Sequence, residues 1–167
     1  MNDQVLKQAL EKVGLLEGSP VSQISSVLVE EACTVTGSKL AYFAIMSDDE
    51  NVLTMLNWSN SAMAECKAID QPIVYQLEKT GLWGDCVRER KPVVTNDYKG
   101  LVKPTKKGYP AGHVSVVRHL NVPMMQGGKI KGVLGVGNKA SDYTQEDIDR
   151  LQRFANEAWL VFAKSPK

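Results

Sequence analysis

The sequence predicts an α+β fold in which helices pack on the faces of an antiparallel sheet. Two runs rich in β-forming residues surround a polar turn early in the chain, and a second pair surrounds a glycine turn near its end. Helical segments precede the first pair and follow the second pair. With 167 residues, the chain has the length of one domain that can bury a core of its own.

The first third of the chain contains two predicted helices and a predicted hairpin. Apolar residues recur at helical spacing in residues 3–14. The second helix is expected to begin with Ser19 as its N-cap and Pro20 at its first helical position, and to end at Gly37. Residues 39–60 form two strand-like runs around the turn SDDEN, which is typical of a hairpin.

The middle of the chain is less regular. Residues 71–81 and 82–91 are expected to form two short helices, and residues 92–98 a short strand with a polar end. A loop rich in glycine, proline and lysine follows between Lys99 and Gly112. Loops of this length without secondary structure of their own are often functional.

The last third contains a second hairpin and a long helix. Residues 119–139 form two strand-like runs around a Gly-Gly turn. Residues 143–164 form an amphipathic helical segment. Thr144 as N-cap and Asp147 three residues later predict a variant of the capping box at its start.

Charge and composition exclude several classes of function. The formal net charge is +1, so no overall field attracts nucleic acid or an anionic membrane. No apolar run approaches the ~20 residues of a spanning helix, and the polar start does not resemble a signal peptide. Cys33, Cys66 and Cys86 are odd in number and form no CxxC motif, which argues against a disulfide framework or a zinc site. These features predict a cytoplasmic protein.

The segment 117–159 combines a strand ending in Val-Pro, a glycine turn, a strand with small residues, an Asn-Lys pair and a capped helix. In these features the chain resembles a GAF domain from about Pro20 onward. Residues 81–98 are similar to the short helix, strand and Asn-Asp pair of that family. With the loop KKGYPAGH, the chain looks most like the GAF domains fused to bacterial and archaeal sensor histidine kinases and diguanylate cyclases.

The resemblance implies a PAS-like architecture, with a central antiparallel sheet, the terminal helices on one face and a ligand pocket on the other. The pocket would lie under the short helices and the long loop. Such domains usually sense a small molecule and pass the signal on through their terminal helices. The resemblance therefore implies a sensory module in signal transduction, with a non-sensing dimerisation module as the alternative.

The two histidines of the chain, His113 and His119, lie in the loop and at the start of the following strand. A metal site needs three or four converging ligands, and no third ligand is near in sequence, so no metal site is predicted. Alternation along the strand places His119 and Asn121 on one face of the sheet. The loop can fold back over this face, because glycine and proline allow its backbone to bend.

The predicted pocket combines residues of the loop, the strands on both sides of it and the short helix. Basic, aromatic and amide side chains around a small cavity suit an anionic or otherwise polar ligand. Trp83 alternatively fills the core, and each histidine alternatively has a purely structural role. The candidate ligand-binding residues are Trp83, Asn96, Tyr98, Lys107, Tyr109, His113, Arg118, His119 and Asn121.

Cyclic nucleotides are an alternative ligand class. The signature of GAF domains in cyclic-nucleotide phosphodiesterases is matched at Asn138, Lys139, Tyr143 and Asp147, but Ile148 stands where that signature has Glu. We interpret the match as structural and expect Lys139 to pair with Asp147 across the turn from strand to helix. Cyclic nucleotide therefore remains the minority interpretation.

Heme and catalysis are further alternatives. The cofactor is left open, and heme is included because His113, His119 or a cysteine could be an axial ligand. Free methionine sulfoxide reductases share the expected fold, but the cysteine arrangement they need is not visible here. Cys86 lies near Arg88 and Arg90, yet a buried structural role is the more common one for such a residue. We therefore expect no catalytic residues and no enzyme activity.

Residues 1–16 are assigned to an N-terminal helix that serves as a linker or dimerisation element, and residues 17–167 to a single GAF domain. Both terminal helices carry apolar stripes, and only one face of each can cover the sheet. The remaining apolar residues are expected to form a homodimer across a two-fold axis; they are Val5, Leu6, Trp159 and Phe162. The other expected partners are a small-molecule ligand and a signalling output domain, such as a histidine kinase of a two-component system or a diguanylate cyclase.

Overall fold

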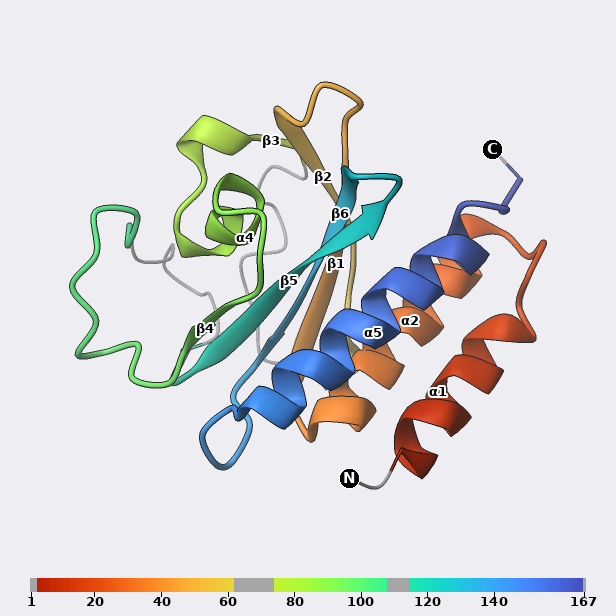
Figure 1. The fold of residues 1–167 in the computed structure, drawn as a ribbon, viewed down its shortest axis with the longest axis horizontal. Coiled ribbons are helices and arrows are strands. Elements are labelled where there is room, and N and C mark those ends of the chain that lie inside the picture. Colours follow the sequence, from red (N-terminus) through yellow and green to blue (C-terminus); the bar gives the residue numbers. More distant parts are fainter. Residues whose placement is uncertain (1–2, 62–73, 108–114, 167) are drawn as a thin grey trace.

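The computed structural model describes residues 3–61, 74–107 and 115–166. A six-stranded antiparallel sheet with the strand order β3-β2-β1-β6-β5-β4 forms its centre (Figure 1). The strands are β1 (Leu40–Met46), β2 (Val52–Trp58), β3 (Val74–Gln76), β4 (Val93–Thr95), β5 (His119–Gln126) and β6 (Lys129–Gly137). The hairpins β1–β2 and β5–β6 are those that the sequence predicts, and they meet where β1 pairs with β6.

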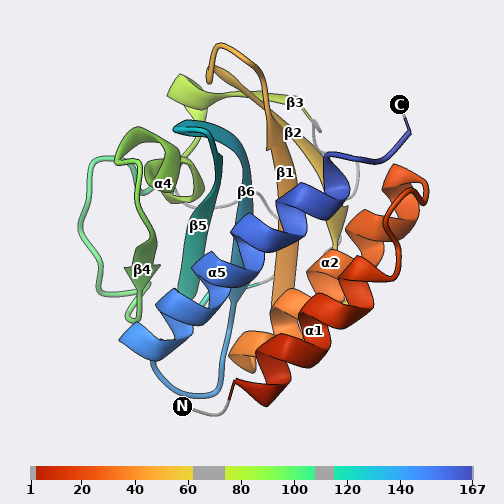
Figure 2. The ribbon, with the colours of Figure 1, turned by 45° about the vertical axis from the view of Figure 1, so that its right-hand side comes forward.

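Among the described elements, three helices cover one face of the sheet, which we call the helix face. They are α1 (Gln4–Gly14), α2 (Val21–Thr36) and α5 (Gln145–Phe162). Helices α2 and α5 contact the strands directly, whereas α1 packs on α2 and α5 as an outer layer (Figure 2). The predicted α+β architecture, with the terminal helices on one face, is confirmed.

The main hydrophobic core lies between the sheet and these helices. Helix α5 buries residues that recur every three or four positions, such as Leu151, Phe154 and Ala158. From the sheet, Phe43 and Leu120 are fully buried against them. Apolar contacts dominate this core, so its stabilisation comes mainly from the burial of apolar surface.

Short elements cover the opposite face, which we call the site face. They are the single 3₁₀ turns η1 (Leu77–Lys79) and η2 (Leu82–Gly84) and the helix α4 (Asp85–Arg88). Cys86 and Val87 of α4 pack into a second, smaller apolar cluster with Met46 and Ile130 of the sheet. The loop after β4 continues along the same side of the molecule (Figure 1).

Two local predictions are corrected by the structure. The predicted helix at 71–81 is wrong for its described part, because Val74–Gln76 forms strand β3 and η1 follows. Strand β3 pairs with the otherwise open edge of β2, and Tyr75 packs against the second cluster, so tertiary pairing prevails over the local helical pattern. Helix α2 begins at Val21, with Pro20 rather than Ser19 at the N-cap position.

The predicted helix ends are confirmed elsewhere. Gly37 terminates α2 in the left-handed conformation at φ 69°. Thr144 and Asp147 form the predicted capping box of α5. Among the described residues, no helix combines the length and the apolar character needed to cross a membrane.

The surface predicted to form a dimer is largely buried by packing within the domain itself. Leu6 and Phe162 are 3% and 8% exposed, and the Phe162 ring meets Phe43 edge-on with centroids 5.0 Å apart. Val5 and Trp159 are half-buried against the same core. Because α1 itself covers the apolar stripe of α5, assigning Leu6 and Phe162 to a dimer surface is wrong. The homodimer stays a prediction.

Candidate functional site

Strand β5 carries two polar residues toward the site face. Leu120 and Val122 belong to the core of the helix face, so the alternating residues His119 and Asn121 lie on the other face, as the sequence predicts. Asn121 is 2% exposed. A buried amide must find partners inside the protein, because leaving it unpaired costs about 1–3 kcal/mol.

A hydrogen-bonded chain runs from Tyr42 on β1 through Asn121 to His119. Asn121 Nδ2 donates to the Tyr42 hydroxyl at 2.6 Å and to the Trp83 carbonyl oxygen at 3.4 Å. Asn121 Oδ1 lies 3.0 Å from His119 Nδ1. Both ends of the amide are therefore engaged, and the chain of contacts ends at the second ring nitrogen of His119.

That second nitrogen, His119 Nε2, is buried and has no hydrogen-bond partner in the part of the chain that the structure describes. The ring faces Tyr98, with centroids 6.3 Å apart and planes inclined by 69°. Burial lowers the pKa of His119 below its ordinary 6.5, and the opposing effects of the Asn121 bond and of Asp85 do not compensate. The imidazole is therefore neutral at pH 7.

Aromatic rings pack against one another beside these hydrogen-bonded residues. Trp83 is half-buried and meets Tyr42 and Tyr75 edge-on, with ring centroids 5.8 Å and 5.2 Å apart. Tyr42 fits against β6 because Gly135 lies beneath its ring, where a Cβ atom would come within 2.1 Å. Each edge-to-face pair stabilises by about 0.5–1.5 kcal/mol beyond its buried area. These contacts fix the positions of the aromatic rings next to Asn121.

Asp85 ties α4 to the loop after β4. Its side chain is 3% exposed. Oδ1 accepts from Arg88 at 2.7 Å, and Oδ2 accepts from Thr105 at 2.8 Å and from Lys103 at 2.7 Å. Burial raises the pKa of Asp85, but the bonds from its three donors, Lys103 foremost, outweigh burial and hold the pKa below 3.8. We call these four residues the Asp85 latch.

The lysines of the loop donate hydrogen bonds to backbone carbonyl groups. Lys106 Nζ donates to the carbonyl oxygens of Tyr98 at 2.6 Å and Leu101 at 3.2 Å, and lies 4.6 Å from the centre of the Tyr98 ring. Lys107 Nζ donates to the Lys79 carbonyl oxygen at 3.2 Å. Lys106 therefore connects two parts of the loop, and Lys107 connects the loop to η1.

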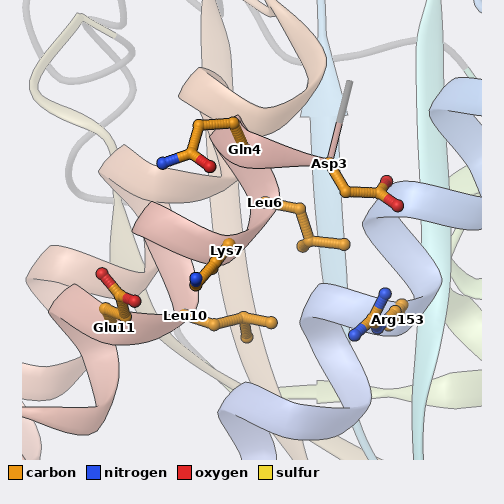
Figure 3. Close-up of a pocket in the computed structure, with 7 residues that line it drawn as sticks. All are labelled: Asp3, Gln4, Leu6, Lys7, Leu10, Glu11 and Arg153. Atoms are coloured by element: carbon orange, nitrogen blue, oxygen red, sulfur yellow. The ribbon is translucent and has the colours of Figure 1, made fainter. Parts of the chain in front are cut away.

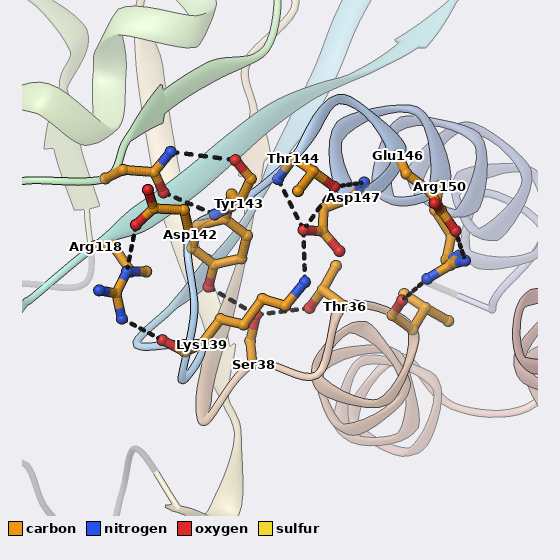
Figure 4. Close-up of polar contacts among 12 residues, drawn as sticks. Thr36, Ser38, Arg118, Lys139, Asp142, Tyr143, Thr144, Glu146, Asp147 and Arg150 are labelled. Carbon is orange, nitrogen blue, oxygen red and sulfur yellow. Dashed lines mark hydrogen bonds and ion pairs between the residues drawn. The ribbon is translucent and has the colours of Figure 1, made fainter. Parts of the chain in front are cut away.

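Arg118 and Asn96 contact the connection between β6 and α5. Arg118 Nη1 donates to the Lys139 carbonyl oxygen at 2.5 Å, and its Nε lies 3.6 Å from an Asp142 carboxylate oxygen (Figure 4). Asn96 donates to the Tyr143 carbonyl oxygen at 3.1 Å and accepts from the Tyr143 amide at 2.7 Å. Both polar ends of the Asn96 side chain are therefore engaged by this connection.

This connection, residues 139–144, is here called the β6–α5 joint. Lys139 Nζ lies 2.6 Å from Asp147 Oδ2, so the predicted ion pair is confirmed, and Asp147 belongs to the capping box of α5 (Figure 4). The Tyr143 hydroxyl lies 2.7 Å from Ser38 Oγ, just beyond the end of α2. The joint thus connects the ends of β4 and β5 with both central helices of the helix face.

The predicted site residues therefore divide into separate groups. Those that the structure brings together are Trp83, Tyr98, His119 and Asn121. Asn96 and Arg118 lie at the β6–α5 joint, and Lys107 lies against η1. The positions of Tyr109 and His113 fall outside the described residues.

Two parts of the site were missed at the level of sequence. The Asp85 latch had one local signal, an acidic residue three positions before an arginine in a short, otherwise apolar helix. Tyr42 had none, because alternation within β1 does not reveal that Gly135 faces it on β6.

A groove of about 530 Å³ lies on the helix face, between α1 and α5 (Figure 3). Its lining residues are Asp3, Gln4, Leu6, Lys7, Leu10, Glu11 and Arg153. Side chains of both charges lie next to one another around it. It contains none of the predicted ligand-binding residues, and the sheet separates it from the ring of His119.

Comparison with known proteins identifies the family. A family model described as GAF domain matches residues 18–163. The chain belongs to the GAF domain family. The methyl sulfide methyltransferase-associated sensor of Methanosarcina acetivorans is 44% identical over 157 residues, which make up 94% of this chain and 16% of that protein. This GAF domain therefore spans only a small part of the length of the curated relative that it matches.

Solved structures show the same fold at low sequence identity. The GAF domain of an Acinetobacter phosphoenolpyruvate-protein phosphotransferase has a TM-score of 0.75 at 16% identity, over 98% of this chain and 94% of that one. The corresponding domain from Coxiella burnetii has a TM-score of 0.71 at 16% identity, over 98% of both chains. Free methionine-R-sulfoxide reductase from Neisseria meningitidis has a TM-score of 0.68 at 13% identity, over 98% and 93%. The same fold therefore also occurs in an enzyme.

The described cysteines of this GAF domain are not activated. Burial raises the pKa of Cys33 to about 11 and the pKa of Cys86 to about 12. Such thiols are protonated at pH 7, and the thiolate is the nucleophilic form. Within the described ranges, no group of three or more His, Cys, Asp or Glu side chains could hold a metal ion. Neither thiol is therefore a candidate catalytic group.

Proposed function

We propose that this GAF domain is a sensory module that binds a small polar molecule beside His119 and signals its presence through α5. The observation that carries the proposal is the half-buried imidazole of His119, whose Nε2 atom is buried and has no partner among the described residues. Membership of the GAF family and the 44% identical relative named as a sensor support a sensory or regulatory role.

The unpaired nitrogen favours the presence of a ligand, because leaving it unpaired lowers the stability of the protein. Leaving a buried donor or acceptor unpaired destabilises a protein by about 1–3 kcal/mol. A ligand that bonds to His119 Nε2 removes this penalty, whereas a purely structural histidine would be expected to have both nitrogens paired. Tyr98 flanks the same position with aromatic surface, which suits a ligand with an apolar body and one polar group.

The contacts of the basic side chains favour a neutral ligand over an anionic one. Arg88 and Lys103 neutralise Asp85, Lys107 bonds to η1, and Arg118 bonds to the joint. An anion at His119 would therefore have to compete for ammonium and guanidinium groups whose hydrogen bonds are already made within the protein, Lys106 included. The proposed ligand is polar but uncharged.

The β6–α5 joint supports the proposed output through α5. Arg118 directly precedes His119, and it bonds to the Lys139 carbonyl group in the joint where α5 is anchored. A ligand that shifts the start of β5 would move this anchor together with the capping box. Such a shift produces a signal only if the ligand binds the two arrangements with different affinity.

The domains and partners beyond this chain are part of the proposal. An output domain such as a histidine kinase or a diguanylate cyclase, a role in a two-component system, a homodimer and a cytoplasmic location all remain predictions, as does the division into residues 1–16 and 17–167. A non-sensing dimerisation module remains the alternative, and the absence of catalysis remains a prediction as well.

Native mass spectrometry of the protein purified from its own cells tests the binding proposal. We expect an additional small-molecule mass on the wild type and on Trp159→Phe, a control on the helix face, but not on His119→Phe. A wild type without additional mass would favour the dimerisation module. A mass that persists on His119→Phe would place the ligand elsewhere.

A further inference from the structure

The orientation of the Asn121 amide is fixed by its neighbours. Its nitrogen faces the Trp83 carbonyl oxygen at 3.4 Å, and that oxygen can only accept a hydrogen bond. Turning the amide over would place two oxygens against each other at this position. The Asn121 oxygen therefore faces His119 Nδ1 at 3.0 Å.

This orientation fixes the tautomer of His119. An amide oxygen only accepts, so Nδ1 must carry the proton and donate to Asn121. In a neutral imidazole the other nitrogen, Nε2, then carries a lone pair. Putting a second proton on Nε2 would charge a ring that burial keeps neutral, with Lys103 adding repulsion and Asp85 attraction.

Among the described residues, the surroundings of Nε2 contain no donor that bonds to this lone pair. Nε2 is buried and has no hydrogen-bond partner among the residues that the structure describes. The Lys106 ammonium lies over the Tyr98 ring, but it donates to backbone carbonyl oxygens. The site thus presents one buried acceptor beside aromatic surface.

We infer that the ligand donates a hydrogen bond, from a hydroxyl or an amide N–H, to the lone pair of His119 Nε2. A carboxylate or phosphate would bring its own lone pairs against that of Nε2 and would be repelled. The inference rests on the proposed function, because it names the chemistry of the ligand bound at that same site. It replaces the anion suggested by the basic residues of the sequence with a neutral donor.

Imidazole ¹⁵N NMR tests the tautomer without any ligand. The chain has two histidines, so His119→Asn assigns the signals. We expect His119 to be protonated at Nδ1 and bare at Nε2 at pH 7 to 8. Asn121→Leu, which removes the acceptor, should abolish this preference. A wild-type ring protonated at Nε2 would overturn the inference.

Matched one-ring probes test the ligand chemistry. Phenol and benzamide have donors, anisole has the same ring without a donor, and benzoate has a carboxylate. We expect phenol and benzamide to shift the His119 Nε2 resonance and raise the melting temperature, and we expect anisole and benzoate to do neither. His119→Phe should lose these responses, whereas Trp159→Phe should retain them.

Other outcomes would distinguish a failure of the inference from a failure of the proposed function. Benzoate binding with protonation of Nε2 would overturn the donor inference and leave the binding site in place. A heme absorbance band that depends on His119 after addition of hemin would make Nε2 an iron ligand and overturn the donor inference as well. If no probe changes the His119 signals and native mass spectrometry finds no bound molecule, the proposed function fails together with the inference.

Discussion

The two faces of the sheet differ in what they bury. On the helix face, α2 and α5 meet the strands through apolar side chains such as Phe43 and Phe154, and α1 packs on both helices. On the site face, the single-turn elements bury Asp85 and Asn121, and almost every polar atom there has a specific partner. Among the described residues, His119 Nε2 on this face and Arg118 Nε beside it are buried without a hydrogen-bond partner.

This difference separates stability from binding. Apolar burial is non-directional and scales with area, so the helix face stabilises the domain without specifying a ligand. Buried polar groups require exact partners and therefore distinguish one molecule from another. The large core of the helix face also allows the site face to keep one acceptor unpaired at a cost of about 1–3 kcal/mol.

The largest expected effect comes from truncating a core residue of the helix face. Phe154 is fully buried, so Phe154→Ala should lower the free energy of unfolding by about 3–5 kcal/mol, because it removes apolar contacts and leaves a cavity. Trp83→Ala on the site face should cost about 1–2 kcal/mol, because part of its ring is already in water. Urea unfolding measures both values. An equal or larger loss for Trp83→Ala would contradict the division of roles between the faces.

The second prediction concerns the Asp85 latch. Asp85→Ala should lower the free energy of unfolding by roughly 3 kcal/mol, because Lys103 and Arg88 lose their buried counter-charge. Glu89→Ala is the matched control, since Glu89 also pairs with Lys103 but is exposed, and it should cost less than about 1 kcal/mol. Urea unfolding of the two variants distinguishes a buried latch from a surface ion pair.

The pH dependence gives the latch prediction a second readout. The folded-state pKa of Asp85 is held below its ordinary 3.8, so its stabilising effect is complete above that pH and is lost as the pH falls further. The difference between wild type and Asp85→Ala should therefore be constant from pH 7 to 5 and shrink below about pH 4. A difference that grows on acidification would count against the latch.

The smallest expected effect concerns the thiols, one near each face. Cys33 and Cys86 have raised pKa values of about 11 and about 12, so both should resist alkylation by iodoacetamide in the folded protein at pH 8. Peptide mapping by mass spectrometry, with and without urea, measures this directly. Rapid labelling of Cys86 in the folded protein would show that α4 readily separates from the sheet. That result would contradict tight packing on the site face.

Sequence patterns predicted the helix face better than the site face. The spacing of Leu151, Phe154 and Ala158 identifies the buried side of α5, because a helix brings residues three and four apart onto one face. The capping box at Thr144 likewise acts within a few residues and can be read locally. The strand at Val74–Gln76 was missed because it depends on an edge of β2 that lies distant in sequence.

For the site, alternation along β5 was sufficient to pair His119 with Asn121, because neighbouring strand residues face opposite sides. It could not show what the basic residues contact. Arg118 directly precedes His119, yet its guanidinium bonds to the Lys139 carbonyl oxygen, 21 residues further along the chain. The expected cluster of cations around an anion therefore did not follow from proximity in sequence.

The sequence by itself determined the GAF family, the α+β order of elements and the faces of the long helix and of β5, since these follow from periodicity and local capping. Only the tertiary structure decided that Asp85 gathers Arg88, Lys103 and Thr105 into a latch. It also decided that Asn121 fixes the tautomer of His119 through Trp83. The physical reason is that hydrogen bonds are short and directional, so their partners are set by how distant segments pack and not by the pattern along the chain.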